Sequence, residues 1–243
     1  MRRKQVVKRF LTWCLSHKLL LIVSLVGLVV IIEFLTLPSL GEIDRLSTVN
    51  PQVTALMKER AEEAAAKRRP YSIHRDWVPL SRMSEDLRHA IIVGEDGTFY
   101  EHEGVDWYEM KESIKKDIER GKFVRGGSTI TQQLSKNLFL STSKDPMRKL
   151  KELLITWRME DKLSKERILE IYLNCIEWGD GIFGVEAAAE TYFGKHAADI
   201  GREEAARLAA VVPSPLKHHP NQDDRFVLYR KDVILGRMEG RGW

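Results

Sequence analysis

A short stretch in the first half of the chain places two carboxylates directly behind an apolar run. Residues 90–106 have the sequence AIIVGEDGTFYEHEGVD, in which the apolar residues 91–93 precede Glu95 and Asp96. A carboxylate beside apolar residues loses hydration when it is charged, so its pKa rises toward the range of a general base. Glu95 is therefore the first candidate for proton transfer, while a turn cap or an ion pair is the structural alternative.

A second polar group follows a pair of glycines. Residues 126–137 have the sequence GGSTITQQLSKN, and on a helical wheel Gln132, Gln133 and Lys136 fall on one face. Ser128 is a suitable cap for such a helix. The free N–H groups at a helix start favour anions, so this face could hold a phosphate-bearing or sugar ligand. An ordinary amphipathic helix with a solvated face explains the same spacing.

Several cations gather next along the chain. Residues 144–152, KDPMRKLKE, place Arg148 four positions before Glu152, and this spacing produces surface salt bridges on helices. The functional alternative is a cationic cluster that faces a pyrophosphate, with Glu152 orienting the cations or holding a metal ion. The members of this cluster are Lys144, Arg148, Lys149 and Lys151.

The positive charge of the chain is concentrated at its N-terminus. The 243 residues have a formal net charge of +4, which by itself suggests a nucleic-acid partner. Residues 1–40 hold six basic side chains against the single acid Glu33, so the rest of the chain is nearly neutral and nucleic-acid binding is not expected. A formal G-x-G-x-x-G match at residues 179–184 follows a predicted helix instead of a strand, which argues against a nucleotide cofactor.

The basic residues 1–18 precede an apolar stretch at residues 19–40. This stretch has the length of a membrane-spanning helix, which needs about 20 residues. It is longer than the apolar core of a usual signal peptide and lacks a small-residue cleavage site, so an uncleaved anchor is favoured. The basic tail predicts a cytoplasmic N-terminus and a main body outside the cytoplasmic membrane. Cys14 and Cys175 then lie on opposite sides of the bilayer and do not form a disulfide.

The remaining residues favour a mainly α fold. Residues 41–70 are expected to form a juxtamembrane connector and a charged helix that is capped at Asn50-Pro51 and ends before Pro70. Residues 71–243 are expected to form one domain, because apolar residues recur at helical spacing and strand-like alternation does not occur. The predicted helices cover residues 84–92, 107–120, 128–138, 150–157, 164–175, 185–192 and 203–212.

Four blocks of residues, in this order, resemble the motifs of the peptidoglycan glycosyltransferases that polymerise lipid II. The blocks are EDGTFYEHEGVD at residues 95–106, GGSTITQQLSKN at 126–137, RKLKE at 148–152 and KERILEIYLN at 165–174. The resemblance extends over roughly residues 50–240. Because the sequence ends at Trp243 with no room for a transpeptidase domain, it resembles the monofunctional biosynthetic form.

The resemblance implies a fold and a reaction. The expected fold is a lysozyme-like helical glycosyltransferase domain with a small membrane-proximal lobe, preceded by one transmembrane helix in the bacterial inner membrane. In the family reaction, the 4-hydroxyl of the acceptor lipid II attacks the anomeric carbon of a lipid-linked glycan chain. Undecaprenyl pyrophosphate leaves, and the linkage inverts from α to β. The implied partners are lipid II, the glycan chain, the membrane, and cell-wall synthesis or division proteins.

The resemblance also implies residue roles. The expected catalytic residues are Glu95, as general base, and Glu152, which would position cations. The residues expected to bind substrate are Ser128, Thr129, Gln132, Gln133, Lys136, Lys144 and Arg148. The residues expected to order the loop around Glu95 are Asp96, Phe99, His102 and Asp106. No organic cofactor is expected, and a divalent Mg or Mn ion at the pyrophosphate, with Glu152 as its candidate ligand, is left open.

Two other functions are compatible with parts of this pattern. A cell-wall hydrolase or lytic enzyme with a lysozyme-like fold would also use Glu95, together with a second carboxylate across the glycosidic bond. Such an enzyme would not need the cationic cluster. A non-catalytic membrane-anchored scaffold of a wall-synthesis complex would tolerate the substitution Glu95→Gln.

Overall fold

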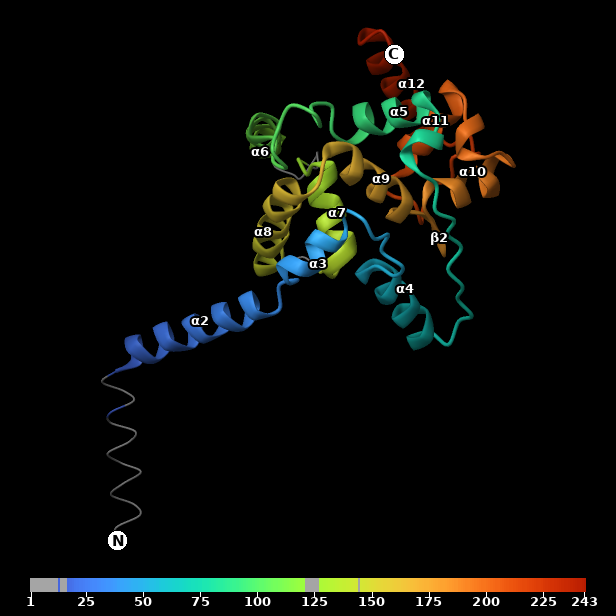
Figure 1. Cartoon of the computed structure of the whole chain (residues 1–243). Helices are drawn as coiled ribbons and strands as arrows, with labels where there is room; N and C mark the ends of the chain where they lie inside the picture. The colour runs from blue at the N-terminus through green and yellow to red at the C-terminus, as the bar shows by residue number, and fades with distance from the viewer. Residues whose placement is uncertain (1–12, 14–16, 121–126, 144) are drawn as a thin grey trace. The chain divides into compact units, whose positions relative to one another are not determined.

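The computed structural model describes residue 13 and residues 17–120, 127–143 and 145–243 (Figure 1). Most of the basic tail lies outside the described residues, and so does Lys144, which the sequence analysis assigned to substrate binding. The chain divides into two compact units, Met1–Pro38 and Ser39–Trp243.

The first unit contains the apolar helix α2 (Lys18–Leu35). Its exposed side chains are largely apolar and include Leu20, Ile22 and Leu25. By length and composition this helix could cross a membrane. The structure is therefore consistent with an N-terminal anchor, and the orientation of the chain across the membrane stays a prediction.

The second unit is mainly helical, as predicted. Its α-helices are α3 (Leu40–Arg45), α4 (Ala55–Ala66), α5 (Glu85–Glu95), α6 (Trp107–Arg120), α7 (Ile130–Phe139), α8 (Pro146–Lys162), α9 (Lys165–Cys175), α10 (Val185–Phe193), α11 (Arg202–Val211) and α12 (Arg225–Gly240). Short 3-10 helices lie at η1 (Leu80–Arg82) and η2 (Ala197–Asp199). The strands β1 (Glu177–Gly179) and β2 (Ile182–Phe183) pair as an antiparallel hairpin between α9 and α10.

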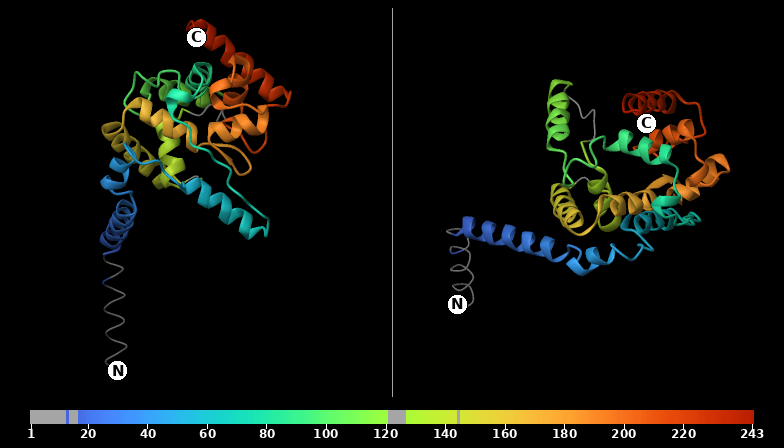
Figure 2. Two further views of the ribbon diagram at one scale, coloured as in Figure 1. Left: turned by 45° about the vertical axis from the view of Figure 1, so that its right-hand side comes forward. Right: turned by 45° about the horizontal axis from the view of Figure 1, so that its top comes forward.

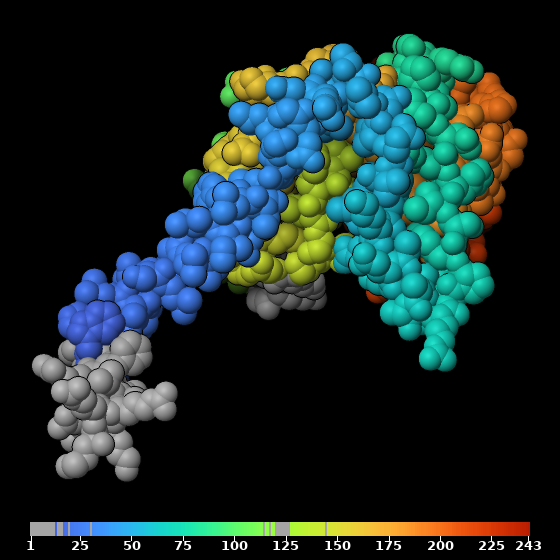
Figure 3. All heavy atoms as spheres, turned by 60° about the horizontal axis from the view of Figure 1, so that its bottom comes forward, coloured from blue at the N-terminus to red at the C-terminus, as the bar shows by residue number. Residues whose placement is uncertain are grey.

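The charged helix near the start of the second unit begins later than predicted. The cap of α4 is Thr54, whose hydroxyl accepts a hydrogen bond from the backbone N–H of Met57 at 3.1 Å. The prediction of a cap at Asn50-Pro51 is therefore wrong. The side-chain oxygen of Asn50 instead accepts a hydrogen bond from Arg167 on α9 at 2.8 Å. Figure 3 shows α3 and α4 on one face of this unit, with part of α7 visible between them.

The hairpin and α12 are departures from the predicted elements of the second unit. The hairpin lies between the helices predicted at residues 164–175 and 185–192, and its tip needs Gly181, which has a positive φ of 76°. A Cβ there would lie 2.4 Å from the carbonyl oxygen of Ser72. The other element is α12, which is capped by Asp224 and has a buried side that includes Val227 and Ile234.

The packing of these helices defines two groups. Helix α5 packs against α11 and α12, and Figure 2 shows the C-terminal helix α12 beside α5. Helix α7 packs against α8 and α9, and it lies between them in Figure 1. The C-terminal end of α5 carries Glu95, and α7 carries Gln132, Gln133 and Lys136, all of which the sequence analysis singled out.

Candidate active site

Glu95 is the last residue of α5, a helix that begins with a cap at Ser84 and is anchored by a buried apolar side. Its side chain is 9% exposed. The Gln133 side-chain nitrogen donates a hydrogen bond to Glu95 Oε2 at 3.0 Å, and Arg230 Nη2 donates to Glu95 Oε1 at 3.2 Å. Each carboxylate oxygen therefore has one donor from a different helix, α7 or α12.

The groups around Glu95 shift its pKa in opposite directions. Burial raises the pKa of Glu95, and the neighbouring charge of Asp96 adds to the rise. The hydrogen bond from Gln133 and the charges of Arg230 and Lys136 lower the pKa and offset part of this effect. A carboxylate whose pKa is raised accepts a proton more readily than an exposed carboxylate, which is what general-base catalysis requires.

The two ends of the Gln133 amide are both engaged. Its nitrogen faces Glu95, and its oxygen accepts a hydrogen bond from the hydroxyl of Tyr172 on α9 at 3.0 Å. Tyr172 is completely buried. The structure places the Gln133 amide between Tyr172 and Glu95, and the expected contact of Gln133 with substrate stays a prediction.

The loop after Glu95 is tied to the first turn of α7. Asp96 is buried, and its Oδ2 accepts a hydrogen bond from the backbone N–H of Ile130 at 2.9 Å. Its Oδ1 lies 2.9 Å from His102 Nε2, while His102 Nδ1 accepts from the backbone N–H of Gly104 at 3.1 Å. Because Nδ1 is an acceptor, the ring proton resides on Nε2 and is donated to Asp96.

The far end of the same loop is held by Asp106 and Phe99. Asp106 accepts hydrogen bonds from the Thr98 hydroxyl and from the backbone N–H of Glu109, the latter at 2.7 Å, and so lies at the start of α6. Phe99 is completely buried, and Lys165 Nζ lies 4.6 Å from the centroid of its ring. Asp96, Phe99, His102 and Asp106 thus all contact the loop or its supports, and their expected role in ordering the loop around Glu95 stays a prediction.

The start of α7 differs from the predicted arrangement. The cap is Thr129 and not Ser128, because the Thr129 hydroxyl accepts from the backbone N–H of Gln132 at 3.2 Å and donates to the carbonyl of Gly104 at 2.6 Å. Gln132 is buried, and its side chain accepts from the backbone N–H of Thr129 at 3.2 Å. Gln132 therefore does not lie on a solvated face, which was the structural alternative for this helix, since the two side chains form a capping box. Its expected contact with substrate stays a prediction.

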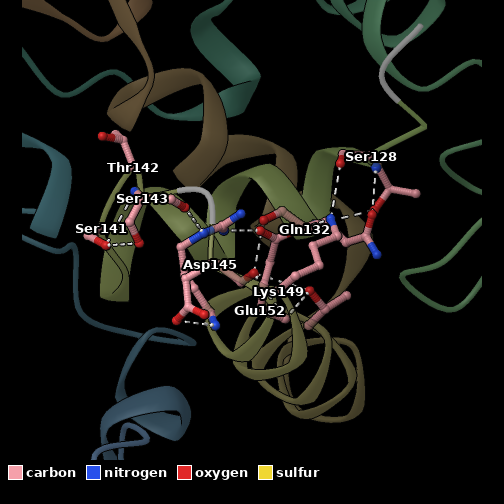
Figure 4. Close-up of polar contacts among 12 residues, drawn as sticks. Ser128, Gln132, Ser141, Thr142, Ser143, Asp145, Lys149 and Glu152 are labelled. Carbon is pink, nitrogen blue, oxygen red and sulfur yellow. Dashed lines mark hydrogen bonds and ion pairs between the residues drawn. The ribbon is translucent and has the colours of Figure 1, made fainter. Parts of the chain in front are cut away.

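Glu152 on α8 is the centre of a second polar group. Its side chain is 4% exposed, so the predicted surface salt bridge is instead largely buried. Arg148 Nη1 donates to Glu152 Oε2 at 2.6 Å, and Lys149 Nζ contacts Glu152 Oε1. Lys149 also donates to the hydroxyl of Ser128 at 3.2 Å, as Figure 4 shows. This contact joins the start of α7 to the cationic end of α8.

Two supports hold the first turn of α8. The cap Asp145 accepts hydrogen bonds from the backbone N–H groups of Met147 and Arg148, at 3.1 and 3.3 Å. Arg148 Nε donates to the carbonyl oxygen of Ser143 at 2.5 Å. The Arg148 guanidinium is therefore fixed both by the loop before α8 and by Glu152.

Lys136 lies one turn after Gln133 on α7. Among the described residues, its ammonium group has no hydrogen-bond or ion-pair partner. Burial lowers the pKa of Lys136, and the nearby charges of Arg148 and Lys149 lower it further, whereas Glu152 opposes them. A partly desolvated ammonium beside two other cations attracts a multiply charged anion.

The comparison with known families bears on this arrangement. A family model described as transglycosylase matches residues 61–239. The chain belongs to the transglycosylase family. The matched residues include Glu95, Glu152 and Arg230, and the mainly helical, lysozyme-like fold expected for a transglycosylase domain agrees with the observed one.

Curated relatives of this transglycosylase family carry one name. A biosynthetic peptidoglycan transglycosylase of Nitrosospira multiformis is 47% identical over 189 residues, which are 78% of this chain and 82% of that protein. A protein of the same name from Janthinobacterium is 46% identical over 189 residues, with the same coverage. One from Dechloromonas aromatica is 43% identical over 219 residues, which are 90% of this chain and 94% of that protein.

The residues around Glu152 do not fit a divalent cation. Both of its carboxylate oxygens contact cationic side chains, Arg148 and Lys149. A bound Mg²⁺ or Mn²⁺ prefers several oxygen ligands, whereas the groups beside Glu152 are positively charged. The positive charges beside Glu152 therefore come from side chains, and we assign no step to a metal ion.

Sequence reasoning did not identify two residues that contact the network around Glu95. Tyr172 belonged to an apolar stripe in the sequence, and only the fold shows that its hydroxyl meets Gln133. Arg230 lies on α12, which was not predicted at all. The available signal was an Asp224 cap followed by apolar residues at helical spacing, with Arg230 and Arg237 on the side toward α11 and α5.

Proposed function

We propose that this chain is a peptidoglycan transglycosylase that extends glycan strands from lipid II. The observation that supports the proposal most directly is the placement of Gln133 and Lys136 on one side of α7. Gln133 contacts the candidate base Glu95, and Lys136 lies one turn further along, beside the Glu152 cluster. One helical turn is a rise of about 5 Å, so a base and an anion site are close neighbours.

The reaction would proceed as a single displacement. The acceptor GlcNAc 4-hydroxyl loses its proton to the carboxylate of Glu95, and its oxygen forms a bond to the anomeric carbon of the donor MurNAc. The bond from that carbon to the pyrophosphate oxygen breaks, and the undecaprenyl pyrophosphate leaves with the electron pair. Attack opposite to the leaving group inverts the linkage to β-1,4, as in inverting sugar chemistry.

The residues near the leaving group match this charge development. Lys136 and Arg148 would contact the departing pyrophosphate, because negative charge that grows in a transition state is stabilised by cations fixed in advance. Glu152 would hold Arg148 and Lys149 in place, and it would not act as a second acid or base. A hydrolase needs a second carboxylate that is available to a water molecule, so these contacts favour the transferase.

The cellular setting follows from the substrate. Lipid II and the growing chain are held in the membrane by their lipid, so an enzyme tethered by α2 would meet them at the bilayer surface. We propose that the N-terminus is cytoplasmic and that the second unit lies outside the inner membrane, because the basic residues precede α2. Cell-wall synthesis or division proteins are proposed partners.

The test is a polymerisation assay with the full chain in detergent micelles and labelled lipid II. We expect long glycan strands that a muramidase cuts back to disaccharide units, and activity that persists when EDTA is added. Loss of activity in EDTA with recovery in Mg²⁺ would instead assign an ion to the substrate pyrophosphate. Shortening of preformed glycan without strand growth would establish the hydrolase. The absence of both strand growth and shortening would favour the scaffold.

A further inference from the structure

Tyr172 stands at one end of a three-residue chain of hydrogen bonds that ends on the candidate base. The chain runs from the Tyr172 hydroxyl to the Gln133 oxygen at 3.0 Å and from the Gln133 nitrogen to Glu95 Oε2 at 3.0 Å. We propose that Tyr172 is a positioning residue, whose hydroxyl fixes the Gln133 amide so that its nitrogen, and not its oxygen, faces the Glu95 carboxylate.

The proposal rests on the chemistry of a glutamine amide. Its two ends have nearly the same shape, but one donates hydrogen bonds and the other accepts them. An ionised carboxylate only accepts, so the amide of Gln133 must present its nitrogen to Glu95. The amide oxygen then points at Tyr172, and without a donor there it would be a buried acceptor with no partner, which is costly.

The Tyr172 hydroxyl is suited to be that donor. It is completely buried at the packed interface of α9 with α7. Burial, together with the charges of Glu95 and Asp96, holds the pKa of Tyr172 well above its usual value, so the hydroxyl keeps its proton. In a chain where each group donates to the next, polarisation strengthens the last bond, which here is the bond to Glu95.

Other groups also act on the same carboxylate. Arg230 from α12 contacts it directly, Lys136 from α7 attracts it, and Asp96 at the end of α5 repels it. These charges do not depend on the Tyr172 hydroxyl. Removing the hydroxyl therefore changes the proton affinity of Glu95 while the contributions of these three charges stay constant. The change is transmitted by the Gln133 amide.

The experiment compares Tyr172→Phe with Tyr192→Phe in the full chain. The control loses a hydroxyl that also donates within the protein, to the carbonyl of Trp178 at 2.9 Å, but away from Glu95. The ¹³C carboxyl signal of Glu95, assigned through Glu95→Gln, is followed against pH. We expect Tyr172→Phe to move the Glu95 titration to higher pH by about 0.5–1 unit, the size of one hydrogen bond, and Tyr192→Phe to leave it unchanged.

Gln133→Ala tests whether the effect passes through the amide. In that background, Tyr172→Phe should cause no further shift of Glu95. A shift of equal size with and without Gln133, or no shift in a folded Tyr172→Phe protein, would refute the positioning role. If Tyr172→Phe does not fold, the test is a titration of the wild-type protein. The side-chain ¹⁵N signal of Gln133 must then change with pH together with the Glu95 signal. A Gln133 signal that does not respond contradicts the proposal.

The kinetic consequence rests on the proposed function. We expect the acid limb of lipid II polymerisation by Tyr172→Phe to shift upward with Glu95, with a rate loss of about three- to tenfold on that limb and an unchanged KM. If the wild-type protein shows the Glu95 and Gln133 titration but polymerises no lipid II, the proposed function fails and the positioning role stands.

Discussion

Glu95 and Glu152 are both nearly buried, and their neighbours give them different chemistry. Their side chains are 9% and 4% exposed, respectively. Glu95 contacts one neutral amide and one guanidinium, whereas Glu152 contacts a guanidinium and an ammonium. Two positive charges neutralise Glu152 and make it an anchor for cations. Glu95 has a single charged partner, and burial raises its pKa, so the same residue type is left able to take a proton.

The largest expected effect comes from removing the base. Glu95→Gln keeps the size of the side chain and eliminates the group that accepts the proton, so we expect polymerisation of lipid II to fall by about 10²–10⁴-fold. Strand growth is measured at saturating lipid II, and circular dichroism checks that the variant is folded. Polymerisation at the wild-type rate would remove Glu95 from the mechanism and erase the difference between the two glutamates.

Substitution of Glu152 should lower the rate less than Glu95→Gln does and lower the stability more. Glu152→Gln leaves Arg148 and Lys149 without their buried counter-charge, so we expect a rate decrease of about 10²-fold and a lower thermal midpoint. Glu203 is the matched control, because it also contacts an arginine and a lysine, Arg207 and Lys231, but is 62% exposed. We expect Glu203→Gln to change neither quantity measurably, and a Glu152→Gln variant with wild-type rate would show that the cluster does not act on the leaving group.

The comparison of Glu95 with Glu152 also shows which contacts can be predicted from the sequence. The partners of Glu152 lie three and four residues before it, so the helical period alone places them together. The partners of Glu95 lie 38 and 135 residues away, and no local pattern could pair them. Glu95 was predictable as a candidate and most of the helices as elements, α12 excepted. The contacts of Tyr172 and Arg230 depend on packing between helices, which a single sequence does not encode in any short window.

The contribution of Arg230 can be separated through the pH dependence of the reaction. Its positive charge lowers the pKa of Glu95, so Arg230→Met should raise that pKa further. Because the base must be ionised, the acid limb of the rate should move to higher pH, with a rate loss of about tenfold on that limb that shrinks as the pH rises. Arg230→Lys keeps a charge and should shift the limb less.

A second arginine provides the control for Arg230. Arg207 contacts a backbone carbonyl, that of Pro220, and the carboxylate of Asp223, which matches the contacts of Arg230 with Ala210 and Glu95. Arg207→Met should leave the pH profile in place. A profile that is the same for Arg230→Met and the wild-type protein would mean that Arg230 supports the fold without acting on Glu95.

The smallest expected effect concerns the helix that connects the two glutamates. Thr129 caps α7 and Thr54 caps α4, each through a hydroxyl that accepts from the backbone three residues ahead. Replacing either by alanine should lower the free energy of unfolding by about 1 kcal/mol, as measured by denaturant titration. Only Thr129→Ala should also slow polymerisation, because α7 carries Gln133 toward Glu95 and Lys136 toward the cations, and Thr129→Ser should restore both quantities. If Thr129→Ala slowed the reaction at unchanged stability, the hydroxyl would act on substrate, as the sequence first suggested, and not as a cap.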